Sequence, residues 1–267
     1  MKNFEKWQGC GNDFVIIDSR VDGKIDSAEK ISRVCDRHFG IGADGVIYVL
    51  NSEVAESRMR IFNADGSEPE MCGNGIRCFT KFYLRGTDKK SLSVETGAGI
   101  LTVNLRGNEV EVDMGKPIFD AEKISVAGYG NNRVINETLD VDGEKFKMTC
   151  VSMGNPHCVI FVDDVTKINL AEVGPKIECH KIFPRKTNVE FFQVIGENKL
   201  RMRVWERGSG ITLACGTGAC ASAVAANLNG LTEKSVEVIL DGGTLKINWN
   251  NRVYMTGSAE KVFDGEY

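Results

Sequence analysis

The chain has 267 residues, of which 42% are hydrophobic and 26% are charged. This is the composition of an ordinary globular protein, and it excludes disordered, coiled-coil and fibrous classes. At roughly 150 residues per domain, the length accommodates one or two domains. The 33 basic and 37 acidic residues give a net charge of −4 without any basic block, so nucleic acid is not expected as a partner. Two counts stand out, 29 glycines and nine cysteines.

The cysteines are an odd number spread over the whole chain, which is not the pattern of a disulfide-stabilised secreted domain. The N-terminus has charged residues where a secretory signal needs an apolar run, and no stretch approaches the roughly 18 apolar residues of a membrane span. We therefore expect a cytoplasmic protein with reduced thiols and no membrane association. Only three histidines are present, and none is spaced as a zinc ligand, so no metal is expected.

In chain order, the hydrophobic pattern first predicts a strand at residues 14–17, a helix from Ala28 to Phe39 and a strand at residues 46–50. The loop between the last two, residues 40–45, matches G-x-G-x-x-G as a string. A dinucleotide site places that string after a strand and before a helix, which is the reverse of this context. We therefore expect no nucleotide at this loop.

Further along the chain, two segments with helical spacing each follow a cysteine, and each ends at a glycine suited to a helix C-cap. The second is so small and apolar that we expect it to be buried on all sides. Alternating apolar residues around several turns predict antiparallel hairpins. The helices follow Cys72, up to Gly86, and Cys215, up to Gly230; the hairpin turns lie at residues 106–108, 241–243 and 249–251.

The chain contains an internal repeat at an offset of 143 residues. The segments MRIF (59–62) and CGNG (72–75) recur as MRVW (202–205) and CGTG (215–218), and Gly11-Asn12 recurs as Gly154-Asn155. Residues 101–105 resemble residues 245–249 at an offset of 144. We therefore predict two homologous halves, residues 1–117 carrying Cys72 and residues 118–267 carrying Cys215, with the last strand free to return to the first half.

The predicted fold class is α+β. Each half is expected to be a strongly curved, barrel-like antiparallel sheet wrapped around one central helix, and the two halves are related by pseudo-symmetry. The surplus of glycine fits turns, helix caps and tight loops in such an arrangement.

The two repeated cysteines lie at the starts of the central helices, where the helix dipole lowers the pKa of a thiol. Backbone N–H groups of Gly73, Asn74, Gly216 and Thr217 suit one carboxylate at these starts. If the halves face each other, a bound amino acid presents its α-carbon between two thiols. One thiolate then removes the α-proton while the other thiol delivers a proton to the opposite face, which inverts the stereocentre.

The remaining seven cysteines show no such arrangement. A buried free cysteine is usually inert packing. We interpret Cys78, Cys150, Cys158 and Cys220 as core residues, while Cys10, Cys35 and Cys179 have no recognisable partner pattern.

Residues 63–67 and 72–77 match the signature N-x-D-G-S-x4-C-G-N-G-x-R at every fixed position. On this signature the chain resembles the diaminopimelate epimerase family, and the resemblance extends over its whole length. Similar blocks lie at residues 11–14, 154–157, 187–191, 205–208 and 214–218. The resemblance implies a homodimeric enzyme that inverts LL-diaminopimelate to the meso form without a cofactor, for lysine and peptidoglycan synthesis.

The resemblance also implies roles for individual residues. Cys72 and Cys215 would be the acid–base pair, with His157 near the first and Glu206 near the second, and Glu206 would also hold the α-ammonium group. Two positions depart from many members of the family, Gly45 where some carry glutamine and Ile211 where an acidic residue is frequent. The distal carboxylate and ammonium groups of the substrate would bind Asn12, Asn63, Asn155, Asn188 and Arg207.

Two other functions remain open from the sequence. A racemase of another amino acid, such as proline or hydroxyproline, would use the same two thiols, although Asn74 and Arg207 would then lack a distal carboxylate to bind. A non-catalytic binding protein of the same fold would not need both cysteines, and both are present here.

Overall fold

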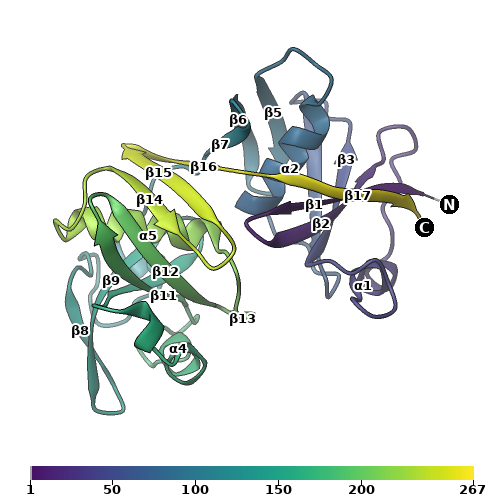
Figure 1. The fold of residues 1–267 in the computed structure, drawn as a ribbon. Coiled ribbons are helices and arrows are strands. Elements are labelled where there is room, and N and C mark those ends of the chain that lie inside the picture. Colours follow the sequence, from purple (N-terminus) through teal and green to yellow (C-terminus); the bar gives the residue numbers. More distant parts are fainter. Residues whose placement is uncertain (1) are drawn as a thin grey trace. The chain divides into compact units, whose positions relative to one another are not determined.

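The computed structural model describes residues 2–267. The chain divides into two compact units (Figure 1). Unit 1 contains the residues up to Asp113 together with Thr256–Tyr267, and unit 2 is Met114–Met255. The chain therefore passes from one unit to the other twice, and its last residues belong to unit 1.

Unit 1 is a mixed sheet with two helices. Its strands pair in the order β17–β1–β2–β3–β4–β5–β6–β7, where β2–β3 and β4–β5 are parallel and the other pairs are antiparallel. The elements of unit 1 are β1 (Asn3–Gly9), β2 (Asn12–Asp18), α1 (Ala28–Cys35), β3 (Gly45–Leu50), β4 (Ser57–Asn63), α2 (Gly73–Leu84), β5 (Ser91–Thr96), β6 (Gly99–Arg106), β7 (Glu109–Asp113) and β17 (Glu260–Glu266).

Unit 2 has the same kind of sheet. Its strands pair in the order β8–β9–β10–β11–β12–β14–β15, where β10–β11 and β12–β14 are parallel, and β13 pairs with β12. The elements are α3 (Ala121–Ile124), β8 (Glu137–Val141), β9 (Glu144–Ser152), β10 (Pro156–Phe161), η1 (Val165–Lys167), α4 (Leu170–Glu178), β11 (Asn188–Gly196), β12 (Lys199–Glu206), β13 (Gly210–Ile211), α5 (Gly216–Leu228), β14 (Ser235–Ile239), β15 (Thr244–Asn250) and β16 (Arg252–Gly257), which continues into unit 1.

The two units share one order of strand pairings. The series β1–β2, β2–β3, β3–β4 and β4–β5 has the same directions as β9–β10, β10–β11, β11–β12 and β12–β14. Strand β11 begins 143 positions after β3, and α5 begins 143 positions after α2. The predicted α+β class is confirmed, although the sheets are mixed rather than wholly antiparallel. Each parallel pair is joined through a helix, because a parallel pairing needs a long crossover connection.

In each unit, the strands pack around one central helix. Helix α2 contacts β1, β2, β3, β4, β7 and β17, and α5 contacts β9, β10, β11, β12, β14 and β15, so strands from across each sheet pack around one helix. The predicted burial of the second helix on all sides is confirmed, because every residue from Gly218 to Ala226 is buried. The small side chains of this segment let the strands approach the helix closely. Each helix is followed by a glycine at positive φ, Gly86 at 72° and Gly230 at 70°.

The glycine-rich loop at residues 40–45 packs against the end of α1. The helix ends at Cys35, earlier than predicted, and the N–H groups of Ile41 and Gly42 then donate to the carbonyl of Val34 at 2.9 and 3.0 Å. A Cβ on Gly40 would lie 2.0 Å from the carbonyl oxygen of Arg33. The loop therefore caps a helix, and its glycines permit the close approach.

The cysteines are free thiols throughout residues 2–267. Cys78, Cys150, Cys158 and Cys220 are buried, as predicted for core residues. Cys179, which showed no pattern in the sequence, is exposed at the end of α4. Over the same residues, no helix is long and apolar enough to cross a membrane.

The contact between this loop and α1 predicts a large effect of Gly40→Ala. The new methyl group would overlap backbone oxygen, so we expect the variant to lose about 2–3 kcal/mol of stability and several degrees in the midpoint of thermal unfolding. Gly196→Ala is the matched control, because a Cβ there would meet only Lys199 at 3.9 Å. Equal midpoints for the two variants would contradict the packing described here.

Candidate active site

In unit 1, Cys72 is the N-cap residue of helix α2. It has an extended backbone, with φ −136° and ψ 122°, and its side chain makes no cap hydrogen bond. The first turn of an α-helix carries N–H groups that no helical carbonyl accepts from, so it favours a negatively charged ligand. Gly73 and Asn74, predicted to bind a carboxylate, form this first turn and are buried.

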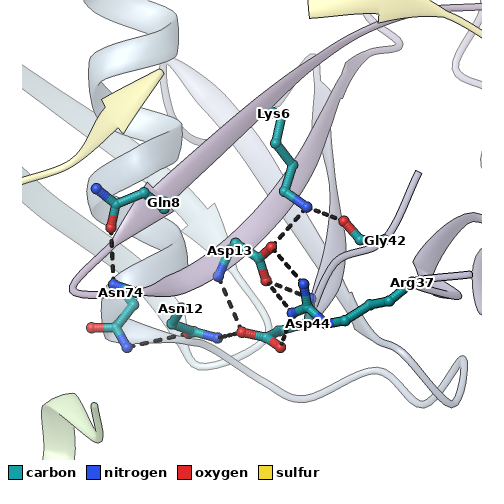
Figure 2. Close-up of polar contacts among 9 residues, drawn as sticks. Lys6, Gln8, Asn12, Asp13, Arg37, Gly42, Asp44 and Asn74 are labelled. Carbon is teal, nitrogen blue, oxygen red and sulfur yellow. Dashed lines mark hydrogen bonds and ion pairs between the residues drawn. The ribbon is translucent and has the colours of Figure 1, made fainter. Parts of the chain in front are cut away.

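The side chain of Asn12 lies between Cys72 and a charged cluster. Figure 2 shows its contacts with Asn74 and Asp44. Its Oδ1 accepts from Cys72 Sγ at 3.7 Å and from Asn74 Nδ2 at 3.2 Å. Its Nδ2 donates to Asp44 Oδ2 at 2.7 Å. The structure thus brings three predicted site residues together. It adds Asp44, which lies in the glycine-rich loop and was not predicted as a site residue.

Asp44 belongs to a network of charges on one side of unit 1. Arg37 donates to Asp13 at 2.7 Å and to Asp44 at 2.8 Å, and Lys6 Nζ lies 2.7 Å from Asp13 and also donates to the Gly42 carbonyl. Burial alone would raise the pKa of Asp13, but hydrogen bonds from Arg37 and Lys6 outweigh it and lower the pKa to about 2. Asp13 therefore stays charged at neutral pH.

Asn63 and Gly45 have clear local roles. Asn63 Nδ2 donates to Ser67 Oγ at 3.0 Å, and its N–H donates to the Ser67 carbonyl at 2.8 Å, which closes the turn after β4. A Cβ on Gly45 would lie 2.5 Å from the Phe62 carbonyl oxygen. The packing of β3 against β4 thus explains the glycine here. A substrate contact by Asn63 stays a prediction.

In unit 2, Cys215 begins helix α5 in the equivalent way. Its Sγ accepts from the N–H of Gly218 at 3.3 Å and lies 3.5 Å from Thr217 Oγ1. Burial raises the pKa of the Cys215 thiol well above its usual value, and the carboxylates of Glu206 and Glu190 raise it further. The expectation that the helix start lowers the thiol pKa is wrong for this residue, because burial and two nearby carboxylates outweigh the helix.

Glu206 lies at the end of β12, beside the short strand β13. Burial raises the pKa of its carboxyl group, and Thr212 Oγ1 donates a hydrogen bond to it. The neighbouring Ile211 is exposed, and its backbone pairs with that of Trp205. Glu206 and Cys215 interact electrostatically, which agrees with the predicted proximity of the two.

His157 is fully buried in unit 2, the unit of Cys215. Its Nδ1 lies 2.7 Å from Glu190 Oε1, and its Nε2 lies 3.0 Å from Asn155 Oδ1. Burial raises the pKa of Glu190. Glu190 was not predicted as a site residue; the signal that could have indicated it was a glutamate within an apolar strand. The predicted proximity of His157 to Cys72 joins two units and stays a prediction.

Asn188 and Arg207 are adjacent in unit 2. Asn188 Nδ2 donates to the Pro156 carbonyl at 2.8 Å, and its Oδ1 accepts from the Arg207 N–H at 2.9 Å. The Arg207 side chain donates to the Arg185 carbonyl at 3.3 Å. The buried amide of Asn188 therefore joins β10, β11 and the loop after β12. In residues 2–267, no group of three or more His, Cys, Asp or Glu side chains is placed to hold a metal.

The model of the family described as diaminopimelate epimerase matches residues 4–119 and 149–262. The chain belongs to the diaminopimelate epimerase family. The diaminopimelate epimerase of Moorella thermoacetica is 53% identical, covering 99% of each chain. That of Desulfitobacterium hafniense is 54% identical over 97% of this chain and 96% of its own, and that of Trichodesmium erythraeum is 51% identical over 99% and 98%.

Solved structures extend the likeness of fold beyond this family. A phenazine biosynthesis protein of the PhzF family from Bacillus anthracis has a TM-score of 0.69 at 21% identity, covering 100% of this chain and 98% of its own. A hydroxyproline epimerase from Agrobacterium vitis, solved with bound trans-4-hydroxy-L-proline, has a TM-score of 0.68 at 12% identity, covering 99% and 91%. At these identities the likeness concerns the fold alone.

The raised pKa of Glu206 predicts how its replacement affects stability. Because the folded-state pKa exceeds the unfolded one, the ionised carboxylate costs stability above the folded-state pKa, and this cost vanishes below the unfolded value near 4.5. Glu206→Gln cannot ionise, so we expect it to raise the midpoint of thermal unfolding more at pH 8 than at pH 4.5. Glu197→Gln, at an exposed position, is the control, and its effect on the midpoint of thermal unfolding should be the same at pH 8 and pH 4.5. A Glu206→Gln effect independent of pH would be incompatible with this assignment.

Proposed function

We propose that this chain is a diaminopimelate epimerase that interconverts LL- and meso-diaminopimelate, in the synthesis of lysine and peptidoglycan precursors. It inverts one α-carbon with Cys72 and Cys215 as the acid–base pair and with no cofactor. The observation that carries the proposal is the placement of these two thiols at the starts of two topologically equivalent buried helices, in a chain of this family.

Each thiol has a defined part in the proposed reaction. The raised pKa of Cys215 means that its thiol holds a proton at neutral pH, so it is ready to deliver one to the α-carbon. Cys72, as the thiolate, removes the α-proton from the opposite face, and the reverse reaction exchanges the two protonation states. Helix N–H groups from Gly73, Asn74, Gly216 and Thr217 bind the α-carboxylate and stabilise the negative charge that develops.

In this proposal, the polar residues near the two thiols have the remaining roles in proton transfer and substrate binding. His157 and Glu206 relay or tune protons, and Glu206 also binds the α-ammonium group. A doubly zwitterionic substrate needs a second set of polar groups, since arginine can take a carboxylate bidentately and asparagine supplies both a donor and an acceptor. We assign the distal carboxylate and ammonium to Asn12, Asn63, Asn155, Asn188 and Arg207.

We also infer the broader setting of the protein. The shared order of strand pairings supports the interpretation that residues 1–117 and 118–267 descend from one duplicated unit, with the last strand returned to the first. The ligand is a small molecule, and the protein acts as a cytoplasmic homodimer without nucleic-acid or membrane partners.

Exchange of the α-hydrogen tests the function directly. In deuterated water without added cofactor, the protein should incorporate deuterium into LL-diaminopimelate as the meso form appears, measured by NMR and chiral chromatography. Cys72→Ala and Cys215→Ala should each lose at least about 10³-fold in rate, since positioned acid–base groups contribute roughly 10²–10⁴-fold each. Cys179→Ala, at an exposed thiol, is the control.

Three results would contradict the proposal. Full activity of Cys72→Ala would exclude the two-thiol mechanism. Faster inversion of proline or hydroxyproline would make the chain a racemase of another substrate. Tight binding of diaminopimelate without any exchange would make it a binding protein.

A further inference from the structure

The side-chain amides of Asn74 and Asn12 form a hydrogen-bonded chain with a charged residue at each end. Arg77 NH1 donates to Asn74 Oδ1 at 3.0 Å, Asn74 Nδ2 donates to Asn12 Oδ1 at 3.2 Å, and Asn12 Nδ2 donates to Asp44 Oδ2 at 2.7 Å. We call Arg77, Asn74, Asn12 and Asp44 the amide chain. Figure 2 shows its last three members.

The charged ends allow only one direction of donation along the amide chain. A guanidinium can only donate, and a carboxylate can only accept. Turning the amide of Asn12 over would place its NH₂ group against the NH₂ group of Asn74 and its oxygen against the Asp44 carboxylate. Both contacts would be repulsive, so the oxygen of Asn12 is held on the side of Cys72.

We propose that Asp44 is a positioning residue of the catalytic site: by fixing the orientation of Asn12, it presents a hydrogen-bond acceptor, rather than a donor, to the thiol of Cys72. This inference rests on the proposed function for its catalytic meaning. The Asn12 oxygen lies 3.7 Å from Cys72 Sγ. An acceptor stabilises the protonated thiol, so the thiolate that removes the α-proton forms at a higher pH than it would beside an NH₂ group.

Asp44 is itself held in place by three donors. Its Oδ1 accepts from Arg37 at 2.8 Å, and its Oδ2 accepts from the Asp13 N–H at 3.1 Å as well as from Asn12. An asparagine at position 44 cannot satisfy all three. If its oxygen faces Arg37, its NH₂ group faces the Asp13 N–H and Asn12, which favours the turned-over amide of Asn12.

The charges around the amide chain come from several elements of unit 1. Burial raises the pKa of the Cys10 thiol, and it raises the pKa of the Cys78 thiol to about 12. The charged ends of the amide chain are Arg77 on α2 and Asp44 in the loop after α1. The other charged groups in this network are Lys6 on β1, Asp13 on β2, and Arg37 in the loop after α1.

The test is the titration of Cys72, measured without substrate. The rate of alkylation by iodoacetamide is followed against pH in the Cys215→Ala protein, and trypsin then releases residues 61–77, which contain Cys72 as their one cysteine. Asp44→Asn should lower the pKa of Cys72 by about 0.5–1 unit, the equivalent of one hydrogen bond. Asp18→Asn is the matched control, because it removes an ion pair with Arg20 at the other end of β2 and should leave the titration unchanged.

Removal of a negative charge would also lower the pKa of a nearby thiol, and a double-mutant cycle separates the two causes. Asn12→Ala removes the acceptor and should itself lower the pKa of Cys72. Adding Asp44→Asn to Asn12→Ala should then cause no further shift, because Asp44 acts through Asn12. If Asp44→Asn does not fold, Asn12→Ala still tests whether the Asn12 oxygen raises the pKa of Cys72.

Two outcomes would overturn the inference. One is an unchanged Cys72 titration in Asp44→Asn or in Asn12→Ala. The other is an equal shift from Asp44→Asn with and without Asn12, which would show a charge effect alone. In the protein with both thiols, Asp44→Asn should also move the pH profile of kcat/KM to lower pH. If no exchange of diaminopimelate occurs while the titration of Cys72 shifts, the proposed function is wrong and the positioning by Asp44 stands.

Discussion

The start of a helix inside a protein leaves N–H groups that need acceptors, and both units depend on how this need is met. Helix α1 follows the usual solution, because Ser27 Oγ accepts from the N–H of Lys30. The central helices begin at Cys72 and Cys215 instead, and sulfur is a weak acceptor. Under the proposed function, their first turns keep the capacity to bind the substrate carboxylate. A stronger cap would stabilise the helix at the expense of that capacity.

The repeated fold places its two thiols in different electrostatic surroundings. Around Cys72, uncharged amides separate the sulfur from a network of ion pairs at the edge of unit 1. Around Cys215, two carboxylates lie close to the sulfur, that of the fully buried Glu190 and that of the half-buried Glu206. A duplicated backbone thus supplies equivalent positions, while the residues from neighbouring strands and loops differ. In the proposed reaction, an acid–base pair that holds one proton between two sulfurs benefits from such a difference.

Much of the fold followed from local sequence. The starts of α2 and α5, their glycine ends and the hairpins were predicted, because caps, turns and periodicity act over a few residues. The parallel pairs β2–β3 and β4–β5 were not, because periodicity identifies a strand without its partner. Asp44 and Glu190 were missed because their roles exist only through contacts with Asn12 and His157, distant in sequence. The predicted direction of the Cys215 pKa shift was wrong because the burial that raises this pKa is a property of the folded chain.

The return of β17 to unit 1 constrains how the protein is made. Strand β1 pairs with β2 on one side and with β17 on the other, and β17 comprises Glu260–Glu266, at the very end of the chain. A ribosome adds about 5–20 residues per second, so the outer edge of β1 waits on the order of 10–50 s for its partner. All of unit 2 leaves the ribosome before that strand does. The sheet of unit 1 therefore keeps an open edge at β1 until β17 has been made.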